Sequence, residues 1–450
     1  MKEQRSNFSG KLGFILAAAG SAVGLGNLWR FPYLAAQYGG GSFIFVYVIL
    51  VLTFGFSMLM MELAIGRKTK QSSITAYQKL HKKFGFLGLL AAIVPVIILP
   101  YYCVIGGWVV KYMLVFLSGQ GKAAAASEYF DTFAAGTVEP LVLFVIFLLA
   151  TMAIVLGGVQ KGVERVSKIL MPLLLILTIG ICIYIATIEG AWEGIKYYLW
   201  PDFSHFSVKT VCAAMGQLFF SLSIAMGIMV SYGSYVKDDI DLSGCVNQIE
   251  LFDTSVALLA GFMIVPAVFM FQPDKLNTAG PGLMFSTLPL VFEKMPFGQV
   301  IGAIFFILVL LAALTSSISI MEAIVSMVMD KFKVARWKAV VGITLVSIFL
   351  GIPSAWGFGL WGDIKILDMD FLSFFDFAAN YVLMPIVALA TCILVGWVVK
   401  PKTIEDEITK NGEKFARKGI FRLMVRFLAP IFLLMILVFY TLVALKVIDL

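Results

Sequence analysis

The chain has 450 residues, of which 60% are hydrophobic and only 14% are charged, and its formal net charge is +7. A soluble domain is about half apolar and about a quarter charged, so this composition indicates a protein that lies mostly in lipid. Two histidines and five scattered cysteines, with no CxxC pair and no HExxH, argue against a metalloenzyme or a redox protein. The excess positive charge lies in loops between apolar runs, which is a topology signal, so we expect no nucleic-acid binding.

Eleven apolar segments follow one another along the chain, and each is long enough to cross a bilayer, which takes about 20 residues. The first includes Gly20, Gly24, Gly26, Asn27 and Arg30, with Pro32 close behind, so we expect a spanning helix here and no cleavable signal peptide. The predicted segments are residues 12–37, 42–66, 86–117, 138–157, 166–187, 208–236, 250–272, 296–329, 338–353, 371–399 and 421–445.

Lysine and arginine are unevenly divided between the connections. Most of them lie at the N-terminus and in the connections 67–83, 158–168, 237–249, 331–338 and 400–426, whereas the alternate connections carry few. Because positively charged loops stay in the cytoplasm, the N-terminus is predicted to be cytoplasmic and, with eleven spans, the C-terminus to be outside. No connection is long enough for a separate folded domain, so we expect residues 1–450 to form one transmembrane domain.

The first segment cannot be a regular helix throughout. Between Gly20 and Asn27 lie three glycines and an amide side chain, in the middle of the span. An isolated glycine in a spanning helix usually marks close helix packing. In such a cluster, however, backbone groups released from the helix survive in lipid only where they line a cavity or bind a ligand. We therefore expect a break at residues 20–27.

A second interruption lies in the sixth segment, where small hydroxylated residues and a glycine divide the aromatic and aliphatic run 219–227. Alone this signal is weak, but the sixth segment follows the first by five. The two interruptions therefore occupy matching places in two halves of five helices each. Matching broken helices in two halves indicate the binding site of an inverted-repeat transporter.

Five short motifs resemble one known family. Residues 24–33 read GLGNLWRFPY, 61–67 MELAIGR, 217–223 QLFFSLS, 231–235 SYGSY and 314–317 LTSS. By these motifs the chain is identified as a member of the neurotransmitter:sodium symporter family, in its bacterial amino-acid transporter branch. The likeness extends over nearly the whole chain, from Arg5 to about residue 445.

This resemblance implies the bacterial leucine-transporter fold, an all-α membrane protein with eleven transmembrane helices. Its two inverted halves of five helices would cover about 11–190 and 205–400, with helices 1 and 6 unwound in mid-membrane. One extra helix, the eleventh, would cover about 420–446.

The resemblance also implies two sodium sites. The first would use the Ala22 carbonyl, the side chains of Asn27, Ser221 and Asp253, and the carboxylate of the substrate. The second would use the residues Gly20, Val23, Ala312, Thr315 and Ser316. Two alternatives stay open: Thr315 and Ser316 could instead bond to carbonyls of their own helix, and Asp253 could cap a polar loop.

The substrate carboxylate would bind the amides of Leu25 and Gly26 and the Tyr102 hydroxyl, and its amine would face the carbonyls of Ala22, Phe220 and Ser223. Monoamine transporters of the family carry an acidic residue where this chain has Gly24, so the expected substrate is a free α-amino acid. A pocket without charged members suits a hydrophobic or aromatic side chain. The residues expected around the substrate are Ala22, Leu25, Gly26, Ile98, Tyr102, Phe220, Ser221, Ser223, Met226, Ser316 and Ile320.

Ionisable residues within the spans are functional by default. By resemblance, Arg30 and Asp376 close the outer side of the site, with Gln217 as a neighbour. Arg5 and Asp330 would close the inner side, although ordinary surface pairing is the alternative for that pair. Glu62 has two interpretations, an acceptor for freed amides of the sixth helix or a direct ion contact.

These features together predict sodium-coupled symport of a hydrophobic or aromatic L-amino acid by alternating access, in a bacterial cytoplasmic membrane. The lack of a cysteine pair in the loop 118–137, where animal relatives have a disulfide, fits that origin. Chloride independence is expected because Asp253 supplies a fixed charge where animal members have asparagine. The alternative is a sodium-independent channel-like or amino-acid-sensing protein on the same fold. An enzyme is not expected, since no nucleophile with a base is visible, and the oligomeric state stays open.

Overall fold

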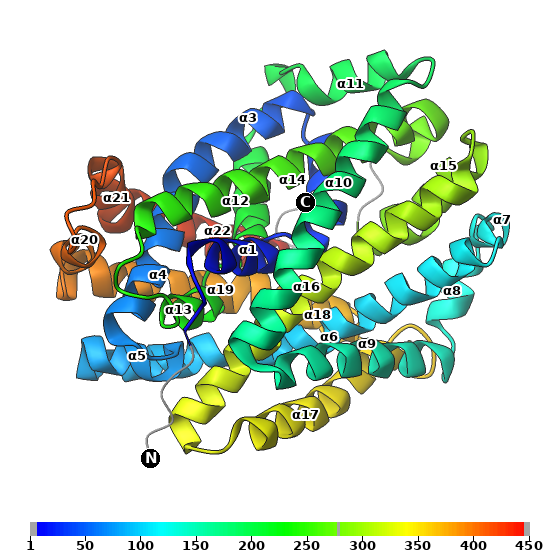
Figure 1. Ribbon diagram of the computed structural model, residues 1–450. Helices are drawn as coiled ribbons and strands as arrows, with labels where there is room; N and C mark the ends of the chain where they lie inside the picture. Colours follow the sequence, from blue (N-terminus) through cyan, green and yellow to red (C-terminus); the bar gives the residue numbers. More distant parts are fainter. Residues whose placement is uncertain (1–6, 277–279, 445–450) are drawn as a thin grey trace.

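The computed structural model describes residues 7–276 and 280–444, and these fold almost entirely into helices. Within them, the only strand pairing is two isolated bridges, Gly40 with Pro201 and Ile366 with Met369. Figure 1 shows the long helices running obliquely beside one another, with short helices gathered at the two ends of the bundle. The predicted all-α fold is confirmed.

Nine helices in the described part of the chain are long and apolar enough to cross a membrane. They coincide with nine of the eleven predicted segments, those from the second to the fifth and from the seventh to the eleventh. Their bounds are Gly41–Thr69, Lys82–Leu117, Glu139–Leu156, Val159–Ala186, Leu242–Phe271, Gly298–Phe332, Arg336–Trp356, Phe371–Val398 and Lys418–Val443.

The first predicted segment is broken where the glycine cluster lies. Helix α1 (Lys11–Ala22) ends at Ala22, and after two non-helical residues the chain continues into a π-helical turn, η1 (Gly26–Arg30), and α2 (Phe31–Gln37). The two parts together could make a tenth span, and the angle between them is 51°. The predicted break in this segment is therefore present.

The sixth predicted segment, 208–236, is divided in the same way into α12 (Val208–Ser221) and α13 (Ile228–Gly233). The stretch between them places Ser223 and Ala225 at φ values of 53° and 63°, a left-handed conformation that costs free energy in residues other than glycine. Neither part alone is long enough to span a membrane, so the count of eleven stays a prediction. The break itself lies where the sequence places it.

The remaining helices complete the bundle and its ends. Short helices lie between the long ones and cap them, and several long helices contain π-helical turns. The bounds are α3 (Gly41–Leu50), η2 (Val51–Gly55), α4 (Phe56–Thr69), α5 (Ser73–Leu80), η3 (Lys82–Phe84), α6 (Gly85–Leu117), α7 (Gly121–Ala124), α8 (Tyr129–Ala134), α9 (Glu139–Leu156), η4 (Val159–Glu164), α10 (Arg165–Ala186), α11 (Ala191–Leu199), η5 (Phe203–His205), α14 (Leu242–Phe271), η6 (Pro273–Lys275), η7 (Leu283–Thr287), α15 (Leu288–Lys294), α16 (Gly298–Phe332), α17 (Arg336–Trp356), α18 (Phe371–Asp376), η8 (Phe377–Leu383), α19 (Met384–Ile393), η9 (Leu394–Val398), α20 (Lys402–Ile408), α21 (Lys418–Leu423), η10 (Met424–Leu428) and α22 (Ala429–Ala444).

Small residues allow α1 to lie close against α16 in the centre of the bundle. Ala17, Ala18 and Ala19 are fully buried, and a Cβ atom added to Gly20 would lie 3.3 Å from the Thr315 Cβ. Backbones that approach closely can gain van der Waals contact and hydrogen bonds that lipid does not offer. The broken part of α1 is thus held directly against α16.

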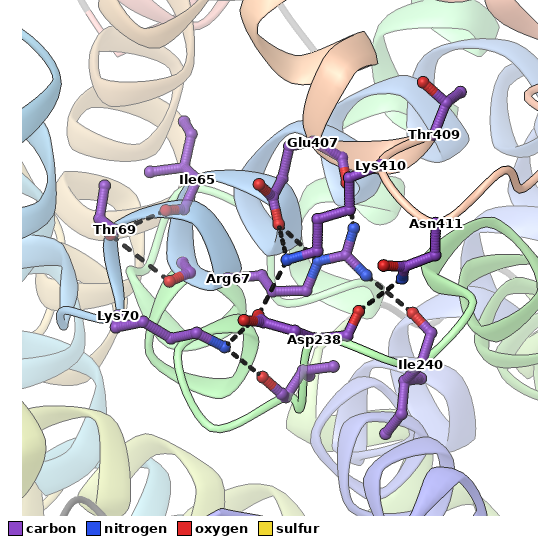
Figure 2. A network of polar contacts seen from close by, with 12 residues as sticks. Ile65, Arg67, Thr69, Lys70, Asp238, Ile240, Glu407, Thr409, Lys410 and Asn411 are labelled. Carbon is purple, nitrogen blue, oxygen red and sulfur yellow. Dashed lines mark hydrogen bonds and ion pairs between the residues drawn. The ribbon is translucent and has the colours of Figure 1, made fainter.

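A polar network joins three connections at one end of the bundle (Figure 2). The buried Arg67 at the end of α4 donates from Nε to Glu407 Oε1 of α20 at 2.8 Å and from Nη1 to the Ile240 carbonyl at 2.7 Å. Lys70 and Lys410 each lie 2.8 Å from Asp238 Oδ1. Hydrogen bonds from Lys410 and Lys70 lower the pKa of Asp238 to about 2, so this carboxylate stays ionised at physiological pH. The network fixes α20 against α4 and against the connection from α13 to α14.

Candidate functional site

The two broken segments face each other across the centre of the bundle. Ser223 Oγ donates to the Ser21 carbonyl at 2.9 Å, and Gln217 Nε2 donates to the Gly26 carbonyl at 2.9 Å. A Cβ atom on Gly26 would lie 2.4 Å from the Phe220 ring, so a glycine is required for this approach. Backbone groups freed by one break are thus partly satisfied by side chains from the other.

A buried cluster of polar side chains lies beside the two breaks. Asn27 Nδ2 donates to Asp253 Oδ1 of α14 at 2.8 Å, and Ser221 Oγ lies 3.0 Å from both carboxylate oxygens. Asn27 Nδ2 also donates to Ser221 Oγ at 3.1 Å, and its Oδ1 accepts from the Gly24 amide at 3.1 Å. The three side chains predicted for the first sodium site therefore lie together, on three different segments.

The residues predicted for the second sodium site meet where α1 ends against α16. Ser316 Oγ lies 3.3 Å from the Gly20 carbonyl and 3.1 Å from the Val23 carbonyl, as a hydrogen-bond donor to both. Thr315 Oγ1 donates to the Ala312 carbonyl at 3.0 Å and to the Leu311 carbonyl at 3.1 Å. Bonding of Thr315 to its own helix was the alternative interpretation, and the structure contains those bonds. The five predicted residues nevertheless lie close to one another, at the contact between the end of α1 and α16.

A small cavity of about 20 Å³ lies between the breaks. Nine of the eleven residues predicted around the substrate line it, while Leu25 and Ser221 do not. The Leu25 amide donates to Tyr102 Oη at 3.2 Å, beside the cavity. The lining residues are Ser21, Ala22, Gly24, Gly26, Ile98, Tyr102, Phe220, Ser223, Met226, Ser316 and Ile320.

A larger cavity of about 540 Å³ adjoins the small one, and Tyr102 and Phe220 line both. Its wall includes nine aromatic residues and the charged residues Arg30 and Asp376. Because Tyr102 and Phe220 belong to both walls, these two residues lie where the two cavities adjoin.

The predicted outer gate residues line the large cavity without contacting each other. Arg30 Nη2 donates to Tyr381 Oη of η8, while Asp376 Oδ1 accepts from Asn380 Nδ2 at 2.6 Å and from Tyr101 Oη at 3.1 Å. In the described residues no ion pair within 4.0 Å joins Arg30 to Asp376. Their pairing stays a prediction for another conformation.

At the opposite end, Arg5 lies outside the described residues, so the inner pair cannot be placed. Asp330 Oδ2 accepts from the Ser72 amide at 2.7 Å. Sequence analysis missed a neighbouring group, in which Tyr235 Oη donates to Glu322 Oε1 at 3.0 Å and Arg336 forms an ion pair with the same carboxylate. Glu322 is an acidic residue within an apolar segment, and that signal could have revealed it.

Glu62 supports the unwound part of the sixth segment. Its Oε1 accepts from the Ala225 amide at 2.7 Å, inside the stretch between α12 and α13. The side chain is buried, with 1% of its surface exposed. Of the two roles predicted for Glu62, the structure shows the acceptor for a freed amide of the sixth segment.

The family model of the Sodium:neurotransmitter symporter family matches residues 5–132 and 131–448. The chain belongs to this family. A sodium-dependent transporter of Haemophilus influenzae is 34% identical over 454 residues, which cover 96% of this chain and 98% of the relative. The sodium-dependent transporter YhdH of Bacillus subtilis is also 34% identical, covering 97% and 98%.

One solved structure is also similar to this protein over nearly its whole length. The crystal structure of MhsT in complex with L-phenylalanine matches it with a TM-score of 0.88 and 36% identity, covering 97% of this chain and 99% of that one. The protein is thus an integral membrane transporter of a sodium-dependent family and not an enzyme, and the predicted fold class is confirmed.

Proposed function

We propose that this symporter couples the entry of a hydrophobic or aromatic L-amino acid to sodium by alternating access. The substrate occupies the small cavity between the two breaks. One sodium ion is held by Ala22, Asn27, Ser221 and Asp253, and a second by the five residues that meet where α1 ends against α16. Phe220 closes the site on the outer side, where Arg30 and Asp376 line the larger cavity.

The observation that carries this proposal is the buried carboxylate of Asp253. This side chain has no exposed surface, and its contacts in the described residues are with the neutral groups of Asn27 and Ser221. An ionised carboxylate without a positive partner is costly to bury, by several kcal/mol. A sodium ion among oxygen ligands at this place would offset that cost.

Binding of sodium here requires a local rearrangement of Asn27. Its amide nitrogen faces Asp253, whereas an ion needs the amide oxygen. Turning the amide group would exchange a hydrogen-bond donor for an oxygen ligand and release the bond that Oδ1 accepts from the Gly24 amide. Sodium binding would in this way be linked directly to the break in the first segment.

We propose that transport does not require chloride, because Asp253 already supplies a negative charge. Tyr47 of α3 lies beside Asp253 and Ser221 and is fully buried. A second anion next to the Asp253 carboxylate would be repelled by it in a medium of low dielectric constant. A fixed carboxylate therefore takes the place of a mobile anion.

The proposed substrate class rests on the lining of the small cavity. None of its lining residues is charged, and Ile98, Phe220, Met226 and Ile320 offer apolar surface. MhsT, which is 36% identical, was crystallised with L-phenylalanine. The cavity of about 20 Å³ holds about one water molecule, so an amino acid enters only if Phe220 or Met226 moves.

We also propose a bacterial cytoplasmic membrane as the location, with the N-terminus inside and the C-terminus outside. The uneven division of lysine and arginine between the connections supports this orientation. The network around Arg67 and Asp238 would then lie at the cytoplasmic end, and the large cavity at the outer end.

A panel of labelled amino acids, offered to proteoliposomes that contain the purified protein, tests this proposal. With an inward sodium gradient we expect uptake of hydrophobic and aromatic L-amino acids, and no concentrative uptake when N-methylglucamine replaces sodium. Equal uptake without sodium would favour a channel-like protein. Binding without any uptake would favour the sensing alternative.

A further inference from the structure

Arg30 lines the large cavity and bonds to Tyr381, whereas Asp376 is the partner that the sequence predicts. Arg30 Nη2 donates to Tyr381 Oη, and its guanidinium carbon lies 5.1 Å from the centre of the Tyr381 ring and 5.7 Å from that of Phe220. Arg30 is buried, with 6% of its surface exposed. A cation in such a setting gains from both the hydroxyl and the faces of the rings.

The ring of Tyr381 is itself supported by the terminal helix. The ring centres of Tyr381 and Tyr440 of α22 are 3.9 Å apart, with an angle of 36° between their planes. Tyr440 is buried, with 6% exposed, and both tyrosines line the large cavity. The last helix of the bundle therefore contributes to the surroundings of Arg30 through one aromatic contact.

Asp376 is held apart from Arg30 by neutral donors. Asn380, one helical turn further along, donates to Asp376 Oδ1 at 2.6 Å, and Tyr101 of α6 donates to the same oxygen at 3.1 Å. Arg30 and Asp376 line the same cavity, and Tyr33 also lies beside Arg30. In this arrangement Arg30 bonds to Tyr381, while the Asp376 carboxylate is an alternative partner on the same cavity wall.

We propose that Tyr381, held by Tyr440, is a positioning residue that keeps Arg30 in the open arrangement of the outer gate. Closure transfers the guanidinium from Tyr381 to Asp376, and the Phe220 ring, which lies under Arg30, moves with it. The terminal helix α22 acts on the gate through Tyr440. This inference rests on the proposed function, since it concerns the opening of the path to the substrate.

Access of a thiol reagent to the large cavity tests this inference. Ile105 of α6 lines the cavity, but with 3% of its surface exposed it is as buried as the five natural cysteines. The probe is therefore an Ile105→Cys variant in a background in which those five cysteines are replaced by alanine. We expect a membrane-impermeant maleimide to label it in the purified full-length protein. Tyr381→Phe removes the hydroxyl and keeps the ring, and should slow labelling about tenfold, because a hydrogen bond to a charged group is lost and closure is favoured.

Further variants separate positioning from a general structural role. Tyr440→Ala should slow labelling in the same direction, whereas Tyr440→Phe, which keeps the ring contact, should restore the original rate. Asp376→Asn should have the opposite effect and keep labelling fast even with sodium and substrate. Val438→Ala, on the exposed face of the same helix with 58% of Val438 accessible, is the matched control and should label normally.

Unchanged or faster labelling in Tyr381→Phe would overturn the inference, and so would equal effects of Tyr440→Ala and Tyr440→Phe. The Tyr381 and Tyr440 variants are labelled without sodium, without an amino acid and without transport, so their rates do not depend on whether the protein takes up amino acids. If the unsubstituted protein failed to take up amino acids with sodium, the proposed function would be wrong, while the labelling rates would still decide the role of Tyr381.

Discussion

Asp253, Asn27 and Ser221 form a buried polar cluster in which a carboxylate contacts neutral hydrogen-bond donors. They come from three separate segments and meet through contacts of 2.8 to 3.1 Å with no exposed surface on Asp253. Such a group is stable only if a cation compensates the charge or a proton neutralises the carboxylate. At the scale of single residues, the breaks in the helices matter because they place the Asn27 amide and the Ser221 hydroxyl beside this carboxylate.

We predict that the two proposed sodium sites respond to the loss of one side-chain oxygen each. Asn27→Ala and Thr315→Val should each abolish sodium-dependent amino-acid binding, measured with a labelled ligand in detergent solution. Thr178→Val is the matched control, since Thr178 Oγ1 also donates to a carbonyl of its own helix, at 2.8 Å from Leu174. If Thr315→Val bound its ligand as well as Thr178→Val does, the second site would be ruled out.

Gly24 gives a second prediction at this scale. A Cβ atom there would lie 2.5 Å from Ser316 Oγ and 2.8 Å from Tyr102 Oη, at the wall of the small cavity. Gly24→Ala should therefore weaken amino-acid binding about 5- to 150-fold, since overpacking costs about 1–3 kcal/mol. Gly180→Ala, where the added atom meets nothing within 4 Å, should bind normally. Equal affinities in the two variants would contradict the placement of the substrate.

At the scale of helices, sequence reasoning succeeded where a local signal existed. The glycine cluster before Asn27 and the small residues after Phe220 marked both breaks, because the cost of unsatisfied backbone groups in lipid is a local property. It missed Tyr381 and Tyr440, whose importance depends on packing between segments far apart: Arg30 and Tyr381 are separated by 351 positions. It also missed the network around Arg67, where ordinary loop charges become paired only in the folded protein.

The network around Arg67 holds α20, which precedes the terminal helix, against α4. Arg67 has no exposed side-chain surface and Glu407 has 8%, so removing one partner leaves a buried charge. We expect Glu407→Gln to lower the free energy of unfolding by about 3 kcal/mol, measured by thermal or denaturant unfolding in detergent. Lys418→Ala, at a pair whose lysine is 47% exposed, should cost less than about 1 kcal/mol. Similar losses in both variants would argue against a special role for Arg67.

At the scale of the whole molecule, the terminal helix is attached at both ends to elements that carry the site. One end, at Lys418, follows α20, which Arg67 fixes to α4 (Figure 2). Near the other end Tyr440 contacts Tyr381, which bonds to Arg30. A change at the outer gate can therefore reach the other end of the bundle through one continuous helix. The broken segments lie between these attachments, where alternating access needs movement.

The central claim, that sodium drives transport through the Asp253 carboxylate without chloride, is tested most directly by one uptake measurement. Proteoliposomes with an inward sodium gradient are supplied with labelled L-phenylalanine, with gluconate replacing chloride, and the unsubstituted protein is compared with Asp253→Asn. We predict concentrative uptake that is unchanged by gluconate, and an Asp253→Asn variant that is inactive or gains a dependence on chloride. Strong stimulation of the unsubstituted protein by chloride, or full activity of Asp253→Asn in gluconate, would contradict the account.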